Sequence, residues 1–359
     1  MNVGIHGLGI HLPKTIRTND WWPQSTVEKW RQKATAAVMR GLQSPDEITT
    51  EGQRRTLEAM AALRDDPFLG CRERRVIDQG QGSADVELLA ARDALADAQV
   101  EAKEIGLLLT YSTTPRYALA PEFGLLHREL GLPRNCISTS VDAVCNAFAM
   151  QLTLAAQMVA SGRVRYALLV QASIHSRLAT DDDLTSALVG DAATALVIGP
   201  AADGYGVLGY AHGTDGDFHR GLVCSVPGGT WYDEGRVMPW SPDARVGRRM
   251  VLSLADWSKQ IVEDALADAR VDRKEVAFYA SHQPTRWLRE LTRDHLGLDN
   301  ARGIDTFPWM ANVMCCNVPL QLALGTREGL LRDGDCVATF SGGAGVTWSG
   351  IVIRWGGCA

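Results

Sequence analysis

The sequence of 359 residues lacks the features of several large classes of protein. It contains no run of about 18 consecutive apolar residues that could cross a bilayer. Residues 1–13 have neither a positively charged start nor a long apolar run. Charge of one sign does not dominate, since 36 Lys and Arg face 42 Asp and Glu and the basic residues are scattered. These absences predict a cytoplasmic protein with no membrane and no nucleic acid as a partner.

Motifs that bind nucleotides or activate a serine are also missing. Gly7 and Gly9 begin a glycine pattern, but position 12 is leucine, so the G-x-G-x-x-G spacing that seats a pyrophosphate is absent. Neither G-x-x-x-x-G-K-[ST] nor G-x-S-x-G occurs. The eight cysteines form no C-x-x-C pair, and adjacent Cys315 and Cys316 are badly placed to chelate one metal. We therefore expect no cofactor, no metal ion and reduced thiols.

What is present is typical of a folded α/β protein. The composition is 46% hydrophobic and 22% charged, and apolar runs alternate with amphipathic segments. We expect strands over residues 2–12, 105–111, 137–144, 166–172, 192–198, 206–211 and 276–280, with a hairpin over 337–355. We expect helices over residues 84–99, 122–130, 146–161, 251–269 and 285–296. This order predicts the α/β class with mixed sheets.

Residues 21–67 differ in composition from the rest of the chain. They are charged and helical in character, and Trp21, Trp22 and Trp30 lie among Lys, Arg and Gln. This pattern predicts a helical insertion. Its aromatic residues either pack the insertion against the body of the protein or line a substrate entrance, and the first interpretation is favoured.

Cys145 is the first candidate for chemistry. It stands where the predicted strand 137–144 turns into the predicted helix 146–161. Free N–H groups and the positive end of a helix dipole at such a place favour a thiolate and lower the pKa of the thiol. The position predicts a nucleophile, and the alternative is a buried structural cysteine at a β-to-α turn.

Three further features could contribute to a site. His282 directly follows the predicted strand 276–280, and sites form at this edge of α/β sheets. Asn312 and Asn317 interrupt an apolar stretch, where a buried amide needs a partner and a substrate carbonyl can serve as one. The glycine-rich turn 342–345 could direct backbone N–H groups at an oxyanion.

Six short motifs follow one another in order along nearly the whole chain. They are Gly70-Cys71-Arg72-Glu73-Arg74-Arg75, Asp142-Ala143-Val144-Cys145-Asn146-Ala147-Phe148, Gly190-Asp191-Ala192-Ala193-Thr194-Ala195, Ser281-His282-Gln283, Ala311-Asn312 and Gly343-Ala344-Gly345-Val346-Thr347-Trp348. Together they resemble the β-ketoacyl-acyl carrier protein synthase III family of thiolase-fold condensing enzymes. The resemblance implies a five-layer αβαβα fold made of two similar halves, residues 1–200 and 201–359, and a homodimer.

The same resemblance implies roles for individual residues. Cys145 would carry the acyl group, and His282 and Asn312 would hold the thioester carbonyl of the second substrate while malonate loses CO2. The N–H groups of Ala344 and Cys145 would form the oxyanion hole. These residue types suit the chemistry, because a thiolate attacks a thioester and an enolate needs neutral donors. The implied partners are acyl carrier protein or coenzyme A thioesters.

Residues around the implied substrate pocket depart from the family pattern. Ala120 stands where the family has a bulky gate at the dimer interface, and Gly342 stands where an aromatic residue is common. Both changes imply a wider pocket. Together with Phe148 and Gly343, they make up the predicted substrate-pocket residues.

The donor site departs from the family as well. Phe68, Leu184 and Trp287 occupy positions where one branch uses arginines for the phosphates of coenzyme A or carrier protein. The family's Gly-Asn-Thr-Ser is replaced by residues 311–314, Ala-Asn-Val-Met. These differences favour specialised metabolism over housekeeping fatty acid synthesis.

Several functions remain open at the level of sequence. The first is decarboxylative Claisen condensation on Cys145. The alternative is a non-condensing acyltransferase of polyketide or other specialised metabolism, which passes the acyl group to a hydroxyl or amine with His282 as base. A long-chain olefin thiolase ranks lower, because its catalytic glutamate would fall at Ala120. A non-catalytic partner subunit is disfavoured by the presence of Cys145, and thioesters would leave Cys145 unlabelled in a hydrophobic-ligand binding module.

Overall fold

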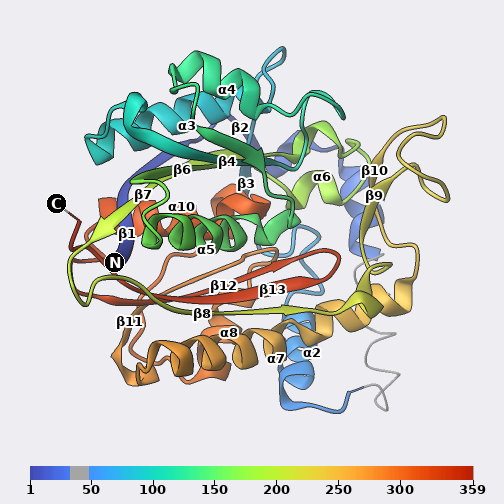
Figure 1. Ribbon diagram of the computed structural model, residues 1–359. Helices are drawn as coiled ribbons and strands as arrows, with labels where there is room; N and C mark the ends of the chain where they lie inside the picture. The colour runs from blue at the N-terminus through green and yellow to red at the C-terminus, as the bar shows by residue number, and fades with distance from the viewer. Residues whose placement is uncertain (33–47, 359) are drawn as a thin grey trace.

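Two β-sheets lie one above the other, with helices between them and on both outer faces (Figure 1). The computed structural model describes residues 1–32 and 48–358, so residues 33–47 of the predicted insertion lie outside the described residues. The first sheet has the spatial order β1 (Asn2–His11), β7 (Asp191–Ala201), β6 (Tyr166–Ile174), β4 (Ile105–Ser112) and β5 (Ile137–Ser140). The second has the order β11 (Val276–Ser281), β12 (Cys336–Gly343), β13 (Thr347–Arg354) and β8 (Gly206–Thr214).

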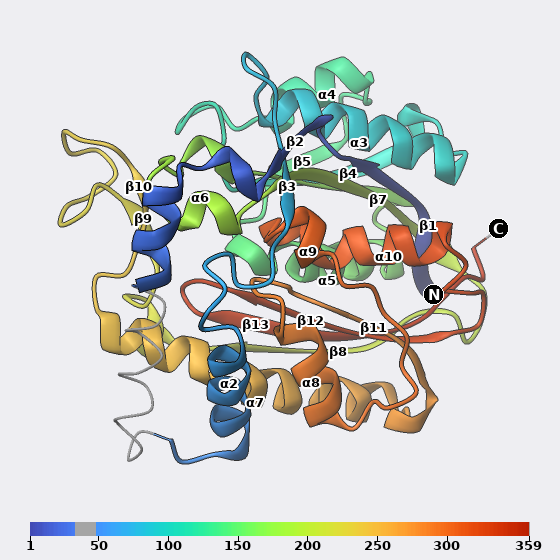
Figure 2. The same cartoon turned by 180° about the vertical axis from the view of Figure 1, so that it is seen from behind.

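The helices complete the five layers. Helices α5 (Ala147–Ala160) and α10 (Asn317–Arg327) lie between the sheets, α3 (Ser83–Ala98) and α4 (Phe123–Leu130) cover the first sheet, and α7 (Ala244–Ala269) and α8 (Leu288–Leu296) cover the second (Figures 1 and 2). This arrangement confirms the expected αβαβα fold with mixed sheets.

The two sheets share one topology. In the first, β4 and β6 are parallel, whereas β6 with β7 and β7 with β1 are antiparallel. In the second, β11 and β12 are parallel, whereas β12 with β13 and β13 with β8 are antiparallel. The first sheet has one additional strand, β5, parallel to β4. The two sheets are therefore similar, as the resemblance implies for the two halves.

Burial on both faces explains the apolar character of the central strands. Every residue of β6 is buried, and the strand is almost continuously apolar, because helices pack on both sides of the sheet. The glycines of β1 serve packing. A Cβ at Gly9 would lie 2.0 Å from the carbonyl oxygen of Ala90, so only glycine allows α3 to approach β1 this closely. The pattern around Gly7 and Gly9 therefore has a structural cause.

The described part of the insertion is helical and packs onto the body. Residues 24–32 are helical, and α2 (Glu51–Ala62) lies beside α7 (Figure 2). Trp22 and Trp30 are 4% and 1% exposed and contact Phe68, whereas Trp21 is 45% exposed. The indole N–H of Trp30 donates to the carbonyl oxygen of Asp182 at 3.0 Å. These contacts favour the packing interpretation for Trp22 and Trp30.

We expect Trp30→Ala to lower the free energy of unfolding by about 3–5 kcal/mol, since the substitution leaves a large cavity among apolar side chains. Urea denaturation followed by circular dichroism measures this. Trp231→Ala is the matched control, because Trp231 is 59% exposed, and we expect its effect to stay within about 0.5 kcal/mol. Equal effects for the two variants would show that Trp30 does not anchor the insertion.

Several elements differ from the sequence-based expectation. The predicted strand 137–144 ends at Ser140, the predicted helix 251–269 begins seven residues earlier at Ala244, and α10 was not predicted. Two small antiparallel pairs were also not predicted: β2 (Thr15–Thr18) with β3 (Glu73–Val76), and β9 (Val223–Ser225) with β10 (Met238–Trp240). Within residues 1–32 and 48–358, no helix is long and apolar enough to cross a membrane.

Candidate active site

Cys145 lies on a sharp turn between the first sheet and the middle layer. After β5 the chain passes through the 3₁₀ helix η4 (Val144–Asn146) and enters α5. Val144 has a φ of 53°, which is unusual for a β-branched residue. The backbone N–H of Val144 donates to a carboxylate oxygen of Asp142 at 3.2 Å and helps to hold the turn. The turn presents Cys145 beside the start of α5, and its side chain stays half-buried.

The expected lowering of the Cys145 pKa is wrong. Burial raises the pKa of this thiol to about 12, and the neighbouring Cys316 acts in the same direction. The contact of the thiol with its own backbone N–H opposes the rise but does not offset it. Desolvation therefore outweighs the favourable position at the helix start. At neutral pH the side chain is a thiol, and a base must take its proton when it attacks.

We expect alkylation of Cys145 by iodoacetamide to accelerate about tenfold per pH unit from about pH 6 to about pH 10 without reaching a plateau, because the thiolate is the reacting species. Mass spectrometry of the peptide that contains Cys145 measures the rate. Glutathione is the control, since an ordinary thiol approaches its plateau near pH 9. A plateau for Cys145 below about pH 8 would show that the helix start governs the pKa after all.

His282 directly follows β11 and is 6% exposed. Burial lowers the pKa of its imidazole to about 4, although the backbone carbonyl of Met314 acts in the opposite direction. The ring is therefore neutral at pH 7. Asn317 Nδ2 lies 3.0 Å from His282 Nδ1, which fixes the ring and leaves Nε2 as the nitrogen that can face a substrate.

The side chain of Asn312 has a fixed orientation. Its Oδ1 accepts hydrogen bonds from the backbone N–H of Met314 at 2.9 Å and from Nδ2 of Asn317 at 2.8 Å. Its Nδ2 consequently points away from these groups and lies 3.3 Å from Met314 Sδ. The backbone of Asn312 is held by bonds to Leu188 and Gly190 at 3.0 Å each. Asn317 therefore bridges Asn312 and His282.

Met314 connects this group to the nucleophile. Its Sδ lies 3.6 Å from Cys145 Sγ and also contacts the amide of Asn312. The structure thus brings together the three residues predicted as catalytic, in the contact order Cys145, Met314, Asn312, Asn317 and His282. From the sequence, Met314 was only a departure from a family motif, and Asn317 was a candidate partner for a substrate carbonyl rather than a bridge between Asn312 and His282.

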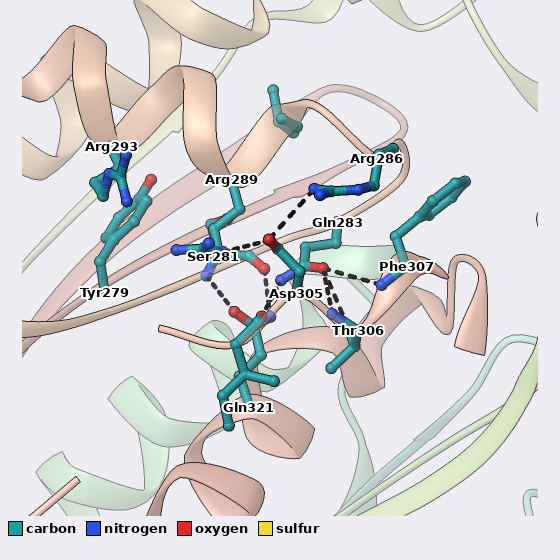
Figure 3. Close-up of polar contacts among 12 residues, drawn as sticks. Tyr279, Ser281, Gln283, Arg286, Arg289, Arg293, Asp305, Thr306, Phe307 and Gln321 are labelled. Atoms are coloured by element: carbon teal, nitrogen blue, oxygen red, sulfur yellow. Dashed lines mark hydrogen bonds and ion pairs between the residues drawn. The ribbon is translucent and has the colours of Figure 1, made fainter. Parts of the chain in front are cut away.

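A network of polar contacts holds the segment around His282 (Figure 3). Gln321 accepts from the N–H of Ser281 at 3.2 Å and donates to its carbonyl oxygen at 2.6 Å. On the other side, the Gln283 amide oxygen accepts from the N–H groups of Thr306 at 2.9 Å and Phe307 at 3.2 Å. Both chain neighbours of His282 are therefore fixed, so the ring has little freedom to move.

The glycine turn lies against the Cys145 turn. A Cβ at Gly343 would lie 2.4 Å from the carbonyl oxygen of Ala143, so a larger residue would push the two segments apart. The last pair of the β12–β13 ladder is Gly343 with Thr347, so Ala344 follows outside the ladder. Asn146 ties the turns together, because its Nδ2 donates to the Thr347 hydroxyl at 3.2 Å. Ala344 is therefore close to the loop that carries Cys145.

The predicted substrate-pocket residues lie in different surroundings. Phe148 is 1% exposed in the core between the sheets. Gly342 has room beside it, since the nearest atom to an added Cβ is Phe340 Cζ at 3.5 Å. Ala120 lies in the exposed segment between β4 and α4. Neither of two cavities near the site, of about 930 and 260 Å³, is lined by Phe148, Gly342, Gly343 or Ala120.

Comparison with known proteins shows similarity to one family. The family models described as 3-oxoacyl-[acyl-carrier-protein] synthase III and its C-terminal part match residues 140–216 and 266–355. The β-ketoacyl-[acyl-carrier-protein] synthase III of Bacillus pumilus is 27% identical over 359 residues, covering 99% of this chain and 100% of the relative.

Solved structures agree in fold. The 3-oxoacyl-(acyl carrier protein) synthase III of Pseudomonas aeruginosa superposes with a TM-score of 0.78 at 21% identity, covering 100% of both chains. The priming β-ketosynthase of the R1128 polyketide pathway superposes with a TM-score of 0.80 at 23% identity, covering 100% of this chain and 97% of the other. Along nearly its whole length the chain is therefore similar to the 3-oxoacyl-[acyl-carrier-protein] synthase III family.

Proposed function

We propose that the protein loads an acyl group onto Cys145 and condenses it with a malonyl thioester in a decarboxylative Claisen reaction. The observation that carries this proposal is the continuous set of contacts from Cys145 through Met314, Asn312 and Asn317 to His282. It combines a nucleophile with two neutral side chains that can donate to one substrate oxygen.

The first step is acylation of Cys145. The sulfur attacks the carbonyl carbon of the acyl donor, the Sγ–C bond forms and the C–S bond of the donor breaks. The thiol proton passes to the departing sulfur, and His282 can relay it because the imidazole is neutral. The N–H groups of Cys145 and Ala344 stabilise the oxyanion of the intermediate.

The second step forms the carbon–carbon bond. Asn312 Nδ2 and His282 Nε2 donate to the thioester carbonyl of the malonyl group, the bond to its carboxylate breaks and CO2 leaves. The electron pair forms an enolate, which attacks the acyl carbonyl. The bond between this carbon and Cys145 Sγ breaks, and the released thiolate takes up a proton from solvent. The low pKa of His282 suits this role, because the ring is neutral at pH 7 and Nε2 can donate a hydrogen bond to the enolate without giving up its proton.

Simple acyl transfer is the second candidate, and one contact favours it. The Asn312 amide now points at the Met314 thioether at 3.3 Å rather than at open space. Condensation requires this amide to reach a substrate oxygen, so the Met314 side chain has to move aside. Transfer to a hydroxyl or amine has no such requirement, since His282 alone serves as base.

A two-arm experiment separates the candidates. Protein that has been acylated on Cys145 is divided between a malonyl thioester and a mixture of small alcohols and amines, and intact-protein mass spectrometry follows loss of the acyl mass. The proposal predicts loss with the malonyl thioester and formation of a 3-oxoacyl thioester. Loss only with the alcohols and amines would assign acyl transfer instead.

We expect acyl carrier protein thioesters to acylate Cys145 faster than the matching coenzyme A esters. Phe68 is 7% exposed beneath Trp22 and Trp30, and Leu184 is partly buried in the same cluster. Neither they nor Trp287 can provide the charge-assisted contacts that arginines make with nucleotide phosphates. Single-turnover acylation measures the preference, with a pantetheine thioester as the control that lacks both nucleotide and carrier. A clear preference for the coenzyme A ester would contradict the expectation.

The protein is also proposed to act as a homodimer. The segment that contains Ala120 carries Tyr117 and Leu119, which are 62% and 86% exposed. Contact with a second copy would cover these apolar side chains. Light scattering during size-exclusion chromatography determines the oligomeric state, and a monomer at micromolar concentration would contradict this proposal.

A further inference from the structure

A small cavity of about 260 Å³ lies next to the turn that carries Cys145. It is bounded by α3, by the ends of β4 and β5, and by the segment before α4. Its lining side chains include three carboxylates and several hydroxyls, and no Lys or Arg: Glu87, Thr110, Tyr111, Ser112, Pro115, Tyr117, Ala118, Pro121, Glu122, Ser140 and Asp142. This lining suits a ligand that is positively charged and donates hydrogen bonds.

Glu87 is the unusual residue in this lining. It is 1% exposed on α3, and neither oxygen of its carboxyl group has a hydrogen-bond partner among the described residues. Glu122 differs, because it accepts from the Ser83 hydroxyl and from the backbone N–H of Arg116 at 3.0 Å. Burial and the nearby Glu122 raise the pKa of Glu87 well above its ordinary value. A buried carboxyl without a partner destabilises the fold unless a ligand satisfies it.

The cavity shares a wall with the Cys145 turn. Asp142 lines the cavity and also accepts from the N–H of Val144, next to Cys145. Tyr111 lines it too. Burial raises the pKa of Tyr111, and the charges of Cys315, Asp142 and Cys145 act in the same direction. The cavity therefore adjoins the turn that carries Cys145.

The nature of the ligand follows from what would satisfy Glu87. A metal ion is disfavoured, because the described residues contain no group of three or more His, Cys, Asp or Glu placed to hold one. An aliphatic chain would leave both oxygens of Glu87 without a partner. An ammonium group donates up to three hydrogen bonds and compensates a carboxylate charge.

We propose that this cavity receives the end of the acyl group on Cys145 and that this acyl group bears an amine, which binds to Glu87 as an ammonium ion. The proposal rests on the proposed function, because it concerns the acyl group that Cys145 accepts. When the ammonium ion binds, the proton of Glu87 passes to solvent and an ion pair remains.

Matched pairs of pantetheine thioesters test this proposal. In each pair an ammonium group replaces a methyl group of the same size: 3-aminobutanoyl with 3-methylbutanoyl, and 6-aminohexanoyl with heptanoyl. Intact-protein mass spectrometry gives the acylation rate of Cys145 for each thioester. We expect the wild-type protein to favour the amine of at least one pair by about tenfold or more, as expected for a charge-assisted hydrogen bond.

Two variants connect the preference to Glu87. Glu87→Gln keeps the shape of the protonated side chain but cannot form the ion pair, so the ratio of the amine rate to the neutral rate should fall to about one in each pair. Glu129→Gln is the control, since Glu129 lies on α4 outside the cavity and pairs with Arg128 at 2.6 Å. It should leave the preference unchanged.

The outcomes are distinguishable. Equal or faster acylation by the neutral member of both pairs overturns the proposal and leaves the proposed function intact. The same holds if the amine preference survives Glu87→Gln, or if 3-hydroxybutanoyl pantetheine outperforms 3-aminobutanoyl pantetheine, which would assign a hydroxyl instead. Failure of all thioesters to modify Cys145 overturns the proposed function and this proposal with it.

Discussion

Cys145→Ala is expected to remain unmodified by every acyl thioester that adds an acyl mass to the wild-type protein. Turnover should fall at least about 10⁴-fold, because the variant lacks the sulfur on which the proposed covalent intermediate forms. Cys145 is half-buried and alanine is smaller, so the variant should keep its fold. Intact mass and peptide mapping after incubation with the thioester measure the effect.

The control for this experiment is another accessible thiol. Cys224 is exposed, and Cys224→Ala should be acylated at the wild-type rate. Acyl mass on Cys224, Cys71 or Cys315 in the wild-type protein, with none on Cys145, would show that the nucleophile has been assigned wrongly.

Asn312→Ala should separate the two steps of the reaction. Loss of one of two donors to the enolate oxygen costs on the order of 2.7–4 kcal/mol, which lowers CO2 release from a malonyl thioester by about a hundred- to a thousandfold. Acylation of Cys145 should continue, because the oxyanion hole proposed for this step consists of the N–H groups of Cys145 and Ala344 and does not include Asn312. Single-turnover acylation and CO2 release are measured on the same sample, and circular dichroism checks the fold.

Two other results would contradict this account. Unchanged CO2 release in Asn312→Ala would show that Asn312 does not contact the enolate. An equal fall in both steps would show that Asn312 mainly positions Met314 and the surrounding loop, since its Oδ1 accepts from the Met314 N–H at 2.9 Å.

The alternation of strands and helices could be predicted because the central strands are buried on both faces and therefore stand out as apolar runs. Helix α10 was missed, because Asn317 and Pro319 in its first turn, and the two cysteines just before it, interrupt the helical pattern. An internal sequence repeat could have revealed this helix. Residues 144–151 and 314–321 both place a cysteine second and a glutamine last, and both begin at a residue of positive φ, 53° at Val144 and 51° at Met314. Each segment continues through a 3₁₀ turn into a central helix.

The pKa of Cys145 shows where sequence reasoning fails at the site. A helix start is a local feature that the sequence reveals, and it favours the thiolate. Desolvation comes from segments far away in the chain, such as the Met314 side chain at 3.6 Å, and it acts in the opposite direction. Whether the pKa of Cys145 rises or falls therefore depends on tertiary packing, which local sequence patterns do not reveal.

The roles of Asn317 and Glu87 also depend on how segments that are far apart in the chain pack together. Asn317 bridges two residues, one of them 35 positions earlier in the chain. Glu87 lies in a helix of ordinary amphipathic appearance, and only the structure reveals that its carboxyl group has no partner among the described residues. Sequence motifs predicted the proposed reacting groups, whereas the residues that orient them could be found only from the fold.

The most direct test of decarboxylative condensation uses malonyl thioester labelled with carbon-13 in the free carboxyl group. Wild-type protein, first acylated on Cys145, is mixed with this substrate, and mass spectrometry measures labelled CO2, the 3-oxoacyl product and the acyl mass left on the protein. The account predicts one labelled CO2 for each 3-oxoacyl thioester formed and each acyl group lost from Cys145. Loss of the acyl group to a hydroxyl or amine acceptor, without labelled CO2, would contradict it.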